Sequence, residues 1–594
     1  MVETLLLLGW QAWLTLAVVV AILVVLVLEI APPDLVMLAG LVILALTGVV
    51  TPRDALAGFS NQALLAVAGL FIVAGAVRNS GTLAYVDRLL TPTSGGLRAA
   101  IFRVMASSAI LSSVMNNTPI VAILAPTVQD RASRAGIAPS KLLIPLAYAT
   151  TMGGMITLIG TSTNLVVSGL LVANGMAPLS LFSLTPVGVA IAVGGILYFL
   201  LIGHRLLPDR VDQRRSTRAE WRAYHFELKV PAISPISGLT IEEAGLRSLR
   251  GAFLAHIHRG GERINIVGPQ QQLHGEDVLG FVGNPQHVDE LLQSGALTRV
   301  VTPPSDEPDE SLPLFEAVVA AHSPLVGHSL KEIEFRERYQ GVVLGIQREG
   351  RALEGLLGRA DLQAGDLLLV EARPSFEQRA MSSGDFYLVA PLERNGLRAT
   401  RRAPAVLITL LAMVAAIATG VVPLTIAVFA GALIMIAIRG ISGTDARRSL
   451  DLSVLITIAA GFGVARALET SGLADAIAKL LVHGVSAWGP IAVLAAVYVA
   501  TVILTEILTN NAAAVLVFPI AVSAAAAVGA DARPFALAVA IAASAGFALP
   551  IGYQTYMMVL GPGGYRFRDF LKVGLPLDFI AAAIAIPLIA ALWM

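Results

Sequence analysis

The sequence contains no cysteine, which excludes disulfides, thiolate metal ligands and cysteine nucleophiles. Charge is also scarce, because 14% of the 594 residues are charged whereas water-soluble chains contain about a quarter. The two signs cancel to a net charge of zero, which by itself points to no partner, and no nucleic-acid partner is expected. No glycine-rich phosphate loop follows a predicted strand and no nucleophile stands beside a base, so the sequence does not predict an enzyme.

Apolar residues take the place of the missing charges. They make up 56% of the chain and give a mean hydropathy of +0.76, values typical of a polytopic α-helical membrane protein. The first apolar run, 9–30, has no basic flank before it and no small-residue cleavage site after it. We therefore interpret it as a retained span and not as a signal peptide.

One short polar stretch occurs twice between apolar runs, at 112–119 and at 505–511. Each copy has a central asparagine, Asn117 or Asn510, and each asparagine is followed nine residues later by a proline. An unpartnered amide among lipid tails costs several kcal/mol. The paired asparagines are therefore expected to face each other, a cavity or a ligand.

A second polar stretch follows each copy at nearly the same distance. Gly160 comes 43 residues after Asn117, and Gly552 comes 42 residues after Asn510. This spacing indicates an internal repeat with an offset of about 392 residues. Interrupted apolar segments at corresponding places in two halves indicate the binding site of a secondary transporter.

Apolar stretches of membrane-spanning length predict five spans and one re-entrant hairpin in each half. In the first half the spans are expected at 9–30, 33–50, 61–78, 141–172 and 181–203, with an amphipathic piece at 83–90 and a hairpin at 100–115 and 119–129. In the second half they are expected at 404–419, 422–438, 452–469, 534–561 and 571–593, with an amphipathic piece at 473–484 and a hairpin at 490–508 and 512–529. An odd number of spans predicts two inverted repeats.

Basic residues are expected on the side of the membrane where the long polar insert lies. Loops on the other side contain only Arg53, Arg466, Lys479 and Arg533. By the positive-inside rule, the sequence predicts an inner (plasma) membrane protein with a cytoplasmic insert and both termini outside the cytoplasm.

The insert, 208–402, has the composition of a soluble α+β domain pair. The segment 274–283 parallels 363–371, and helices are expected to start at 241–243 and 331–334. The predicted domains are a first transmembrane repeat at 1–207, insert domains at 208–300 and 301–402, and a second repeat at 403–594. The second insert domain begins with a linker, 301–313.

The two asparagine-bearing tips, the Gly-Thr-Ser-Thr-Asn break at 160–164 and the run 557–565 resemble the divalent anion:sodium symporter (solute carrier 13) family. The insert resembles two copies of the TrkA-C (RCK C-terminal) domain of potassium-transport regulators. The resemblance implies a sodium-coupled secondary transporter of small divalent anions in the lipid bilayer, with dicarboxylate and sulfate as the leading substrates. We expect a homodimer with elevator-type alternating access, modulated by an unidentified small ligand on the insert.

The resemblance also implies roles for particular residues. It assigns the anion to Asn117, Thr118, Asn510 and Asn511. It assigns a first sodium ion to Ser112, Asn116, Asn117 and the backbone at Gly160, and a second to Thr505, Asn510 and the backbone at Gly552.

The chemistry of the polar stretches agrees with an anion site. A fixed cation at the bilayer centre costs at least about 2.5 kcal/mol, so an anion is better held by helix N-termini and neutral hydrogen bonds. Half-helices are expected to begin at Pro119 and Ala512. The expected hydrogen-bonding side chains are those of Asn117, Thr118, Thr161, Ser162, Asn510, Asn511, Gln554 and Thr555.

Several interpretations stay open from the sequence. The polar residues could be interhelical contacts without a ligand. Glu506 could carry a coupling proton, although a cap or gate contact is the stronger reading. His256 and His258 share a face of a predicted strand and could bind a metal, but an exposed pair without further ligands usually does not. A proton-coupled or exchanging carrier and a regulated ion channel are the alternative functions.

Overall fold

The computed structural model contains two compact units, which are described separately. One comprises Met1–Asp209 and Asn395–Met594, and the other comprises Arg210–Arg394. The structure describes residues 8–28, 30–82, 84–87, 96–210, 225–246, 252–260, 262–264, 270–283, 292, 295–299, 313–321, 323–348, 351–353, 357–391 and 399–594. The predicted linker therefore lies outside the described residues except for Pro313, as does part of the amphipathic piece at 83–90.

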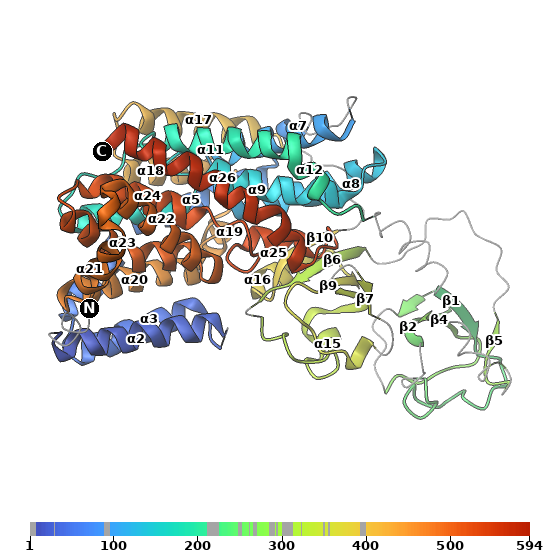
Figure 1. Ribbon diagram of the computed structural model, residues 1–594. Coiled ribbons are helices and arrows are strands. Elements are labelled where there is room, and N and C mark those ends of the chain that lie inside the picture. Colours follow the sequence, from blue (N-terminus) through green and yellow to red (C-terminus); the bar gives the residue numbers. More distant parts are fainter. Residues whose placement is uncertain are drawn as a thin grey trace. The chain divides into compact units, whose positions relative to one another are not determined.

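The first unit is helical (Figure 1). Its amino-terminal part contains the helices α2 (Trp10–Val27), α3 (Pro33–Leu46), α4 (Pro52–Leu56), α5 (Gln62–Ser80), α6 (Ala84–Asp87), α7 (Gly96–Ser112), α8 (Asn117–Arg134), α9 (Leu143–Gly154), α10 (Ser162–Ala173), α11 (Thr185–Tyr198) and α12 (His204–Leu206). Its carboxy-terminal part contains α17 (Ala403–Ala418), α18 (Leu424–Ala437), α19 (Gly443–Arg448), α20 (Leu452–Thr470), α21 (Leu473–Val485), α22 (Pro490–Ile507), α23 (Asn510–Ala527), α24 (Ala532–Ser544), α25 (Gln554–Leu560) and α26 (Phe567–Trp593).

Several of these helices suit a bilayer. Among the described residues, 7 are long and apolar enough to cross a membrane, and further apolar helices are shorter. Large apolar side chains on the outside of this unit are strongly exposed, for example Leu46 at 83% and Phe579 at 70%. Such a surface is costly in water and suits lipid tails, so the chain is a multi-pass membrane protein.

Two helices of this unit are broken where the sequence predicts polar interruptions. The chain leaves helical geometry at 155–161, between α9 and α10, and at 545–553, between α24 and α25. The first break ends earlier than predicted, because helix resumes at Ser162 with Thr161 in extended geometry. Helices α8 and α23 begin at Asn117 and Asn510, two residues before the predicted starts, because Asn116 and Thr509 cap them. In Figure 1, α8 and α23 lie toward opposite ends of the unit.

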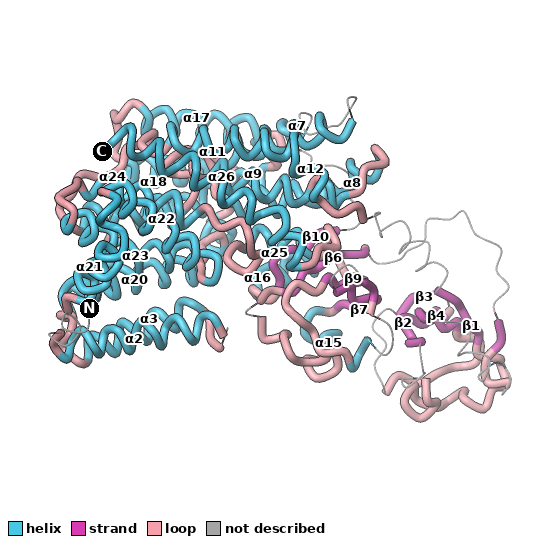
Figure 2. Tube along the Cα trace, in the orientation of Figure 1, coloured by secondary structure: helices cyan, strands magenta, loops and turns pink. Residues whose placement is uncertain are grey.

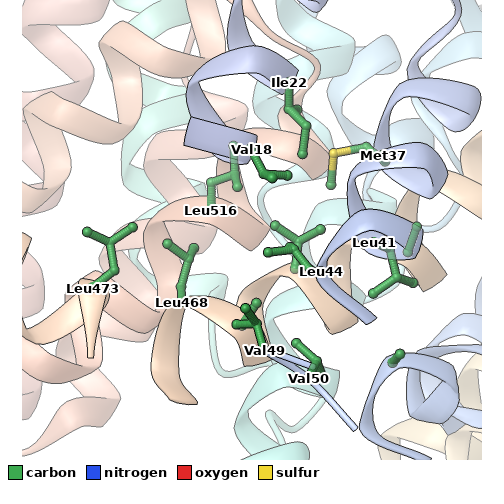
Figure 3. Close-up of a cluster of buried hydrophobic side chains, with 14 of the residues drawn as sticks. Val18, Ile22, Met37, Leu41, Leu44, Val49, Val50, Leu468, Leu473 and Leu516 are labelled. Carbon is green, nitrogen blue, oxygen red and sulfur yellow. The ribbon is translucent and has the colours of Figure 1, made fainter. Parts of the chain in front are cut away.

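An apolar cluster fixes the first two helices to the carboxy-terminal part of the unit. Figure 3 shows side chains of α2 and α3, among them Ile22 and Leu41, facing Leu468 of α20 and Leu516 of α23. Gly40 of α3 allows close packing, since a Cβ there would lie 2.5 Å from Cδ1 of Ile22. The two parts of the membrane unit thus share one core.

The second unit contains two five-stranded antiparallel sheets (Figure 2). The first has the order β3-β2-β4-β1-β5 and consists of β1 (His225–Lys229), β2 (Ala252–Arg259), β3 (Glu262–Ile264), β4 (Val278–Gly283) and β5 (Thr298–Arg299). The second has the order β10-β6-β9-β7-β8 and consists of β6 (Leu314–Val319), β7 (Gly341–Arg348), β8 (Arg351–Ala352), β9 (Leu367–Ala372) and β10 (Phe386–Pro391). Helices α15 (Phe335–Tyr339) and α16 (Ser375–Ser383) accompany the second sheet.

The two sheets correspond residue by residue at an offset of 89. Arg259 forms a bidentate pair with Asp277, as Arg348 does with Asp366. In each sheet the same arginine also donates to a backbone carbonyl, that of Gln272 or of Asp361. The hydrogen bonds to Asp277 hold the pKa of the Arg259 guanidinium above its usual range.

The helices expected to start at 241–243 and 331–334 are not formed there. Both segments are hydrogen-bonded turns, and α15 begins only at Phe335. In each turn a glutamate bonds back to the hydroxyl residue three positions earlier, Glu243 to Thr240 and Glu332 to Ser329. The accepted backbone N–H lowers the pKa of both carboxyl groups. The pattern that resembles a capping box thus closes a turn.

Candidate anion and cation site

The tip between α7 and α8 is closed by its own polar side chains. Ser112 Oγ donates to Asn117 Oδ1 at 2.5 Å, and the backbone N–H of Asn117 donates to Asn116 Oδ1 at 2.8 Å. Ser112 and Asn117 are both buried. Three residues predicted to bind the first sodium ion therefore meet at one end of α8.

The first break passes directly over this tip. A Cβ at Gly160 would lie 2.8 Å from the Ser112 carbonyl oxygen and 2.6 Å from that of Gly154. A Cβ at Gly154 would in turn lie 2.7 Å from Asn117 Oδ1. Only glycine permits so close an approach, and it gathers hydroxyl, amide and carbonyl oxygens, the ligand type that suits a hard cation.

The tip between α22 and α23 repeats this arrangement. Thr505 Oγ1 lies 3.2 Å from Asn510 Oδ1, again five residues along the chain, and donates to the Ala543 carbonyl at 2.6 Å. A Cβ at Gly552 would lie 2.4 Å from the Thr505 carbonyl oxygen. The residues assigned to the second sodium ion are thus also brought together.

The two tips meet through the breaks of the opposite part of the chain. Asn117 Nδ2 donates to the Tyr553 hydroxyl at 3.3 Å, although 436 residues separate them. The same hydroxyl lies close to Asn510 and Thr161. On the other side, Ser162 Oγ donates to Asn511 Oδ1 at 3.2 Å. The tips therefore lie around a common centre.

Most of the predicted anion ligands surround this centre. Thr118 Oγ1 donates to Gln554 Oε1 at 3.5 Å, and both side chains are accessible. Ser162, Asn510 and Asn511 are partly buried. These groups can offer hydrogen bonds to a solute, and the first turns of α8, α10 and α23 add backbone amides at positive helix ends.

Thr555 does not belong with the accessible group. It is fully buried, and its hydroxyl forms no hydrogen bond among the described residues. It lies in the first turn of α25. Tyr553 was not predicted, yet its hydroxyl accepts a hydrogen bond from Asn117. Its position directly after Gly552 is the signal that could have found it.

Two carboxyl groups support the second break. Glu506 accepts from the backbone N–H groups of Ala548 at 2.8 Å and Leu549 at 2.6 Å. Asp578 of α26 accepts from Phe547 N at 2.9 Å, and the two carboxyl groups are close neighbours. The contact of Glu506 is with unwound backbone and not with the end of a helix. Asp578 was not found there, because nothing local links it to a segment 30 residues earlier.

Neutral groups support the first break. Asn164 Nδ2 donates to the carbonyl groups of Gly154 at 3.1 Å and Thr157 at 2.9 Å. Thr185 Oγ1 donates to the Ile156 carbonyl at 2.7 Å, and the Thr157 hydroxyl donates to the Ser113 carbonyl. The two breaks therefore have similar geometry and different supports.

Helices that cross a membrane, interrupted where two polar tips meet, define the class of integral-membrane transport proteins. Residues 23–540 match the model of the citrate transporter (CitMHS) family, and the chain belongs to this family. This membership supports the expected relationship to divalent anion:sodium symporters at the level of the family.

Individual relatives agree with this membership. An uncharacterised transporter of Synechocystis is 32% identical over 98% of this chain and 97% of its own length. Sodium/sulfate cotransporter 1 of Chlamydomonas reinhardtii is 24% identical over 96% of this chain and 88% of its own. The YdaH transporter of Alcanivorax borkumensis, a solved structure, is 11% identical with a TM-score of 0.44, over 93% of this chain and 87% of that one. The family and the Synechocystis and Chlamydomonas relatives are transporters, so the chain belongs among transporters and not enzymes.

Proposed function

We propose that this protein is a secondary carrier that moves a small divalent anion, sulfate or a dicarboxylate, together with sodium. The observation that carries the proposal is that each tip contacts the break of the opposite half, Asn117 through the Tyr553 hydroxyl and Asn511 through the Ser162 hydroxyl. Neutral donors and helix N-termini at such a centre suit an anion without a fixed counter-charge. The sodium/sulfate cotransporter among the relatives supports the same substrate class and coupling ion.

Two sodium ions are assigned to the oxygen groups beneath the tips. The first would be held by Ser112, Asn116, Asn117 and the carbonyl groups near Gly160, and the second by Thr505, Asn510 and those near Gly552. Each set presents hydroxyl, amide and carbonyl oxygens, which suit a hard cation. Sodium would draw a tip and its break together, and this order would prepare the anion site.

We infer two inverted repeats, 1–207 and 403–594, each with five spans and a hairpin. The matched tips, the matched breaks and the opposite placement of α8 and α23 support this reading. Elevator-type movement of the hairpins and broken helices within a homodimer follows from the same comparison with symporters.

The insert is inferred to be a cytoplasmic pair of TrkA-C-like domains, 208–300 and 301–402, that binds a small regulatory ligand. Two sheets of one strand order and an equivalent arginine–aspartate pair in each support the duplication. Both termini would then lie outside the cytoplasm of the plasma membrane.

Uptake into proteoliposomes tests the proposal. Radiolabelled sulfate and succinate are offered with an inward sodium gradient, with equal sodium on both sides, and with potassium in place of sodium. Accumulation above the outside concentration only with the sodium gradient is expected. Single-channel currents, or uptake that never exceeds equilibration, would instead support the regulated channel.

Proton coupling is the second candidate, because the carboxyl groups of Glu506 and Asp578 are close neighbours in the membrane unit. Two carboxylates at such a distance repel, so the pair can hold a proton between them. Accumulation driven by an inward proton gradient in sodium-free buffer would support this candidate. Accumulation that follows sodium alone would reject it.

A further inference from the structure

We propose that the first sheet of the soluble unit carries a transition-metal site formed by Glu227, His256 and His258. One ligand atom of each residue lies within 4.8 Å of the others. The two imidazole rings are perpendicular, with centroids 5.0 Å apart, and His256 Nε2 lies 3.8 Å from Glu227 Oε1. The inference is independent of the proposed transport function.

The strand register places the three residues on one face. Glu227 of β1 and His256 of β2 both pair with Gly280 of the strand between them, β4. His258 follows His256 by two positions, which returns its side chain to the same face of the strand. The sheet therefore directs three ligand side chains from two strands toward the space above Gly280.

Gly280 keeps this space open. A Cβ at position 280 would lie 2.1 Å from Cε1 of His256 and 2.2 Å from its Nε2. The imidazole consequently lies flat over the glycine and is only 1% exposed, whereas Glu227 and His258 are partly exposed. His256 thus forms the buried side of the cluster, and Glu227 and His258 form its accessible side.

The donor set suits zinc and its neighbours in the periodic table. Two imidazoles and a carboxylate are ligands that Zn²⁺ accepts, with a fourth position left for water or another ligand. Ligands at tetrahedral zinc are roughly 3.4 Å apart, so small rotations of the side chains would bring the present atoms onto one ion.

The second sheet provides a natural comparison inside the same chain. At the offset of 89, Glu227 corresponds to Glu316, His256 to Gly345 and His258 to Gln347. Gly280 corresponds to Leu369, which pairs with Gly345. The first sheet thus pairs a large residue of β2 with a glycine of β4, whereas the second sheet pairs a glycine of β7 with a large residue of β9. A backbone irregularity precedes His256 and Gly345 alike. The fold is thus formed without the histidines, and a structural role does not explain them.

Metal binding to the full-length, tag-free protein in detergent tests the proposal. After treatment with a chelator, Co²⁺ is added and its absorption spectrum is recorded, and Zn²⁺ affinity is measured by calorimetry. We expect one ion per chain and a tetrahedral Co²⁺ spectrum. His258→Gln, which copies the residue of the second sheet, should weaken Zn²⁺ binding at least about tenfold.

His256→Ala should weaken binding at least as much, and His328→Ala is the matched control. His328 is an exposed histidine of the same unit and bonds to the carbonyl of Val326. It should leave the affinity unchanged. Absence of Zn²⁺ binding by the wild-type protein would overturn the proposal, as would unchanged affinity in His258→Gln with an unaltered thermal unfolding curve. Equal losses in His258→Gln and His328→Ala would overturn it too.

Discussion

The two tips of the membrane unit share a geometry and differ in what stands behind them. In both, a hydroxyl lies against the asparagine amide five residues later. Behind the first tip, the break is supported by the neutral side chains of Asn164 and Thr185. Behind the second, carboxyl groups accept three successive backbone N–H groups. The polar contacts within the two tips are thus alike, while the second tip has carboxyl groups beneath it.

The largest effect is expected from variants that remove the asparagine amide, which both tips contain. Asn117→Ala and Asn510→Ala should each reduce sodium-driven anion uptake to background, because each removes an amide at the common centre. Uptake into proteoliposomes is the measurement. Asn174→Ala is the control, since its side chain bonds to its own helix at Leu170 and should leave uptake intact. Uptake near wild type in both tip variants would refute the site.

The second-largest effect is expected at the second tip and not at the first. Glu506→Gln replaces an acceptor oxygen with an amide, so the backbone N–H of Leu549 loses its partner at a cost of about 1–3 kcal/mol. We expect a lower unfolding temperature and uptake reduced roughly tenfold, measured on the same preparation. Ser113→Ala, at the corresponding position of the first tip, should be near wild type, because its hydroxyl bonds to the nearby carbonyl of Ile110 in α7. Equal losses in both variants would remove the distinction.

A smaller effect compares the two hydroxyl groups. Ser112→Ala and Thr505→Val should raise the sodium concentration for half-maximal uptake, about fivefold and about tenfold respectively, by the loss of roughly 1 kcal/mol or slightly more. The second should be larger because Thr505 also donates to Ala543. Ser107→Ala, whose hydroxyl bonds to Arg103 of its own helix, is the control. A change in anion affinity alone would contradict the cation assignment.

The smallest effect concerns the connection between the tips. Tyr553→Phe deletes one neutral hydroxyl, worth about 1 kcal/mol, and should change the apparent anion affinity up to about fivefold. Tyr498→Phe is the control, because that buried hydroxyl has no hydrogen-bond partner among the described residues. Concentration-dependent uptake measures both. Equal behaviour of the two variants would show that the Tyr553 hydroxyl does not join the tips.

Local pattern predicted that polar interruptions occur, and it placed the starts of α8 and α23 to within two residues. It did so because amides, glycines and prolines in apolar surroundings have few explanations. Contacts between distant segments were not predictable in this way. Asp578 and Tyr553 acquire their partners only when helices far apart in the chain pack together.

The errors have local causes. Thr555 was predicted together with its neighbour Gln554, and the structure shows that Thr555 is buried whereas Gln554 is exposed. The expected insert helices at 241 and 331 are turns, since the same hydroxyl–glutamate pairing closes either structure. For the histidines, the sequence did not reveal the neighbouring carboxylate of Glu227, which comes from β1 and lies 29 residues before His256. The sodium and anion assignments stay predictions.

The carboxyl support of the second break also constrains how the membrane unit can move. Glu506 belongs to α22 and Asp578 to α26, yet both hold the same three residues of unwound backbone. Sliding α22 past α26 would strip acceptors from amides that have no water nearby to replace them. We therefore expect α22, α26 and the chain between α24 and α25 to stay together in any conformational change of the membrane unit.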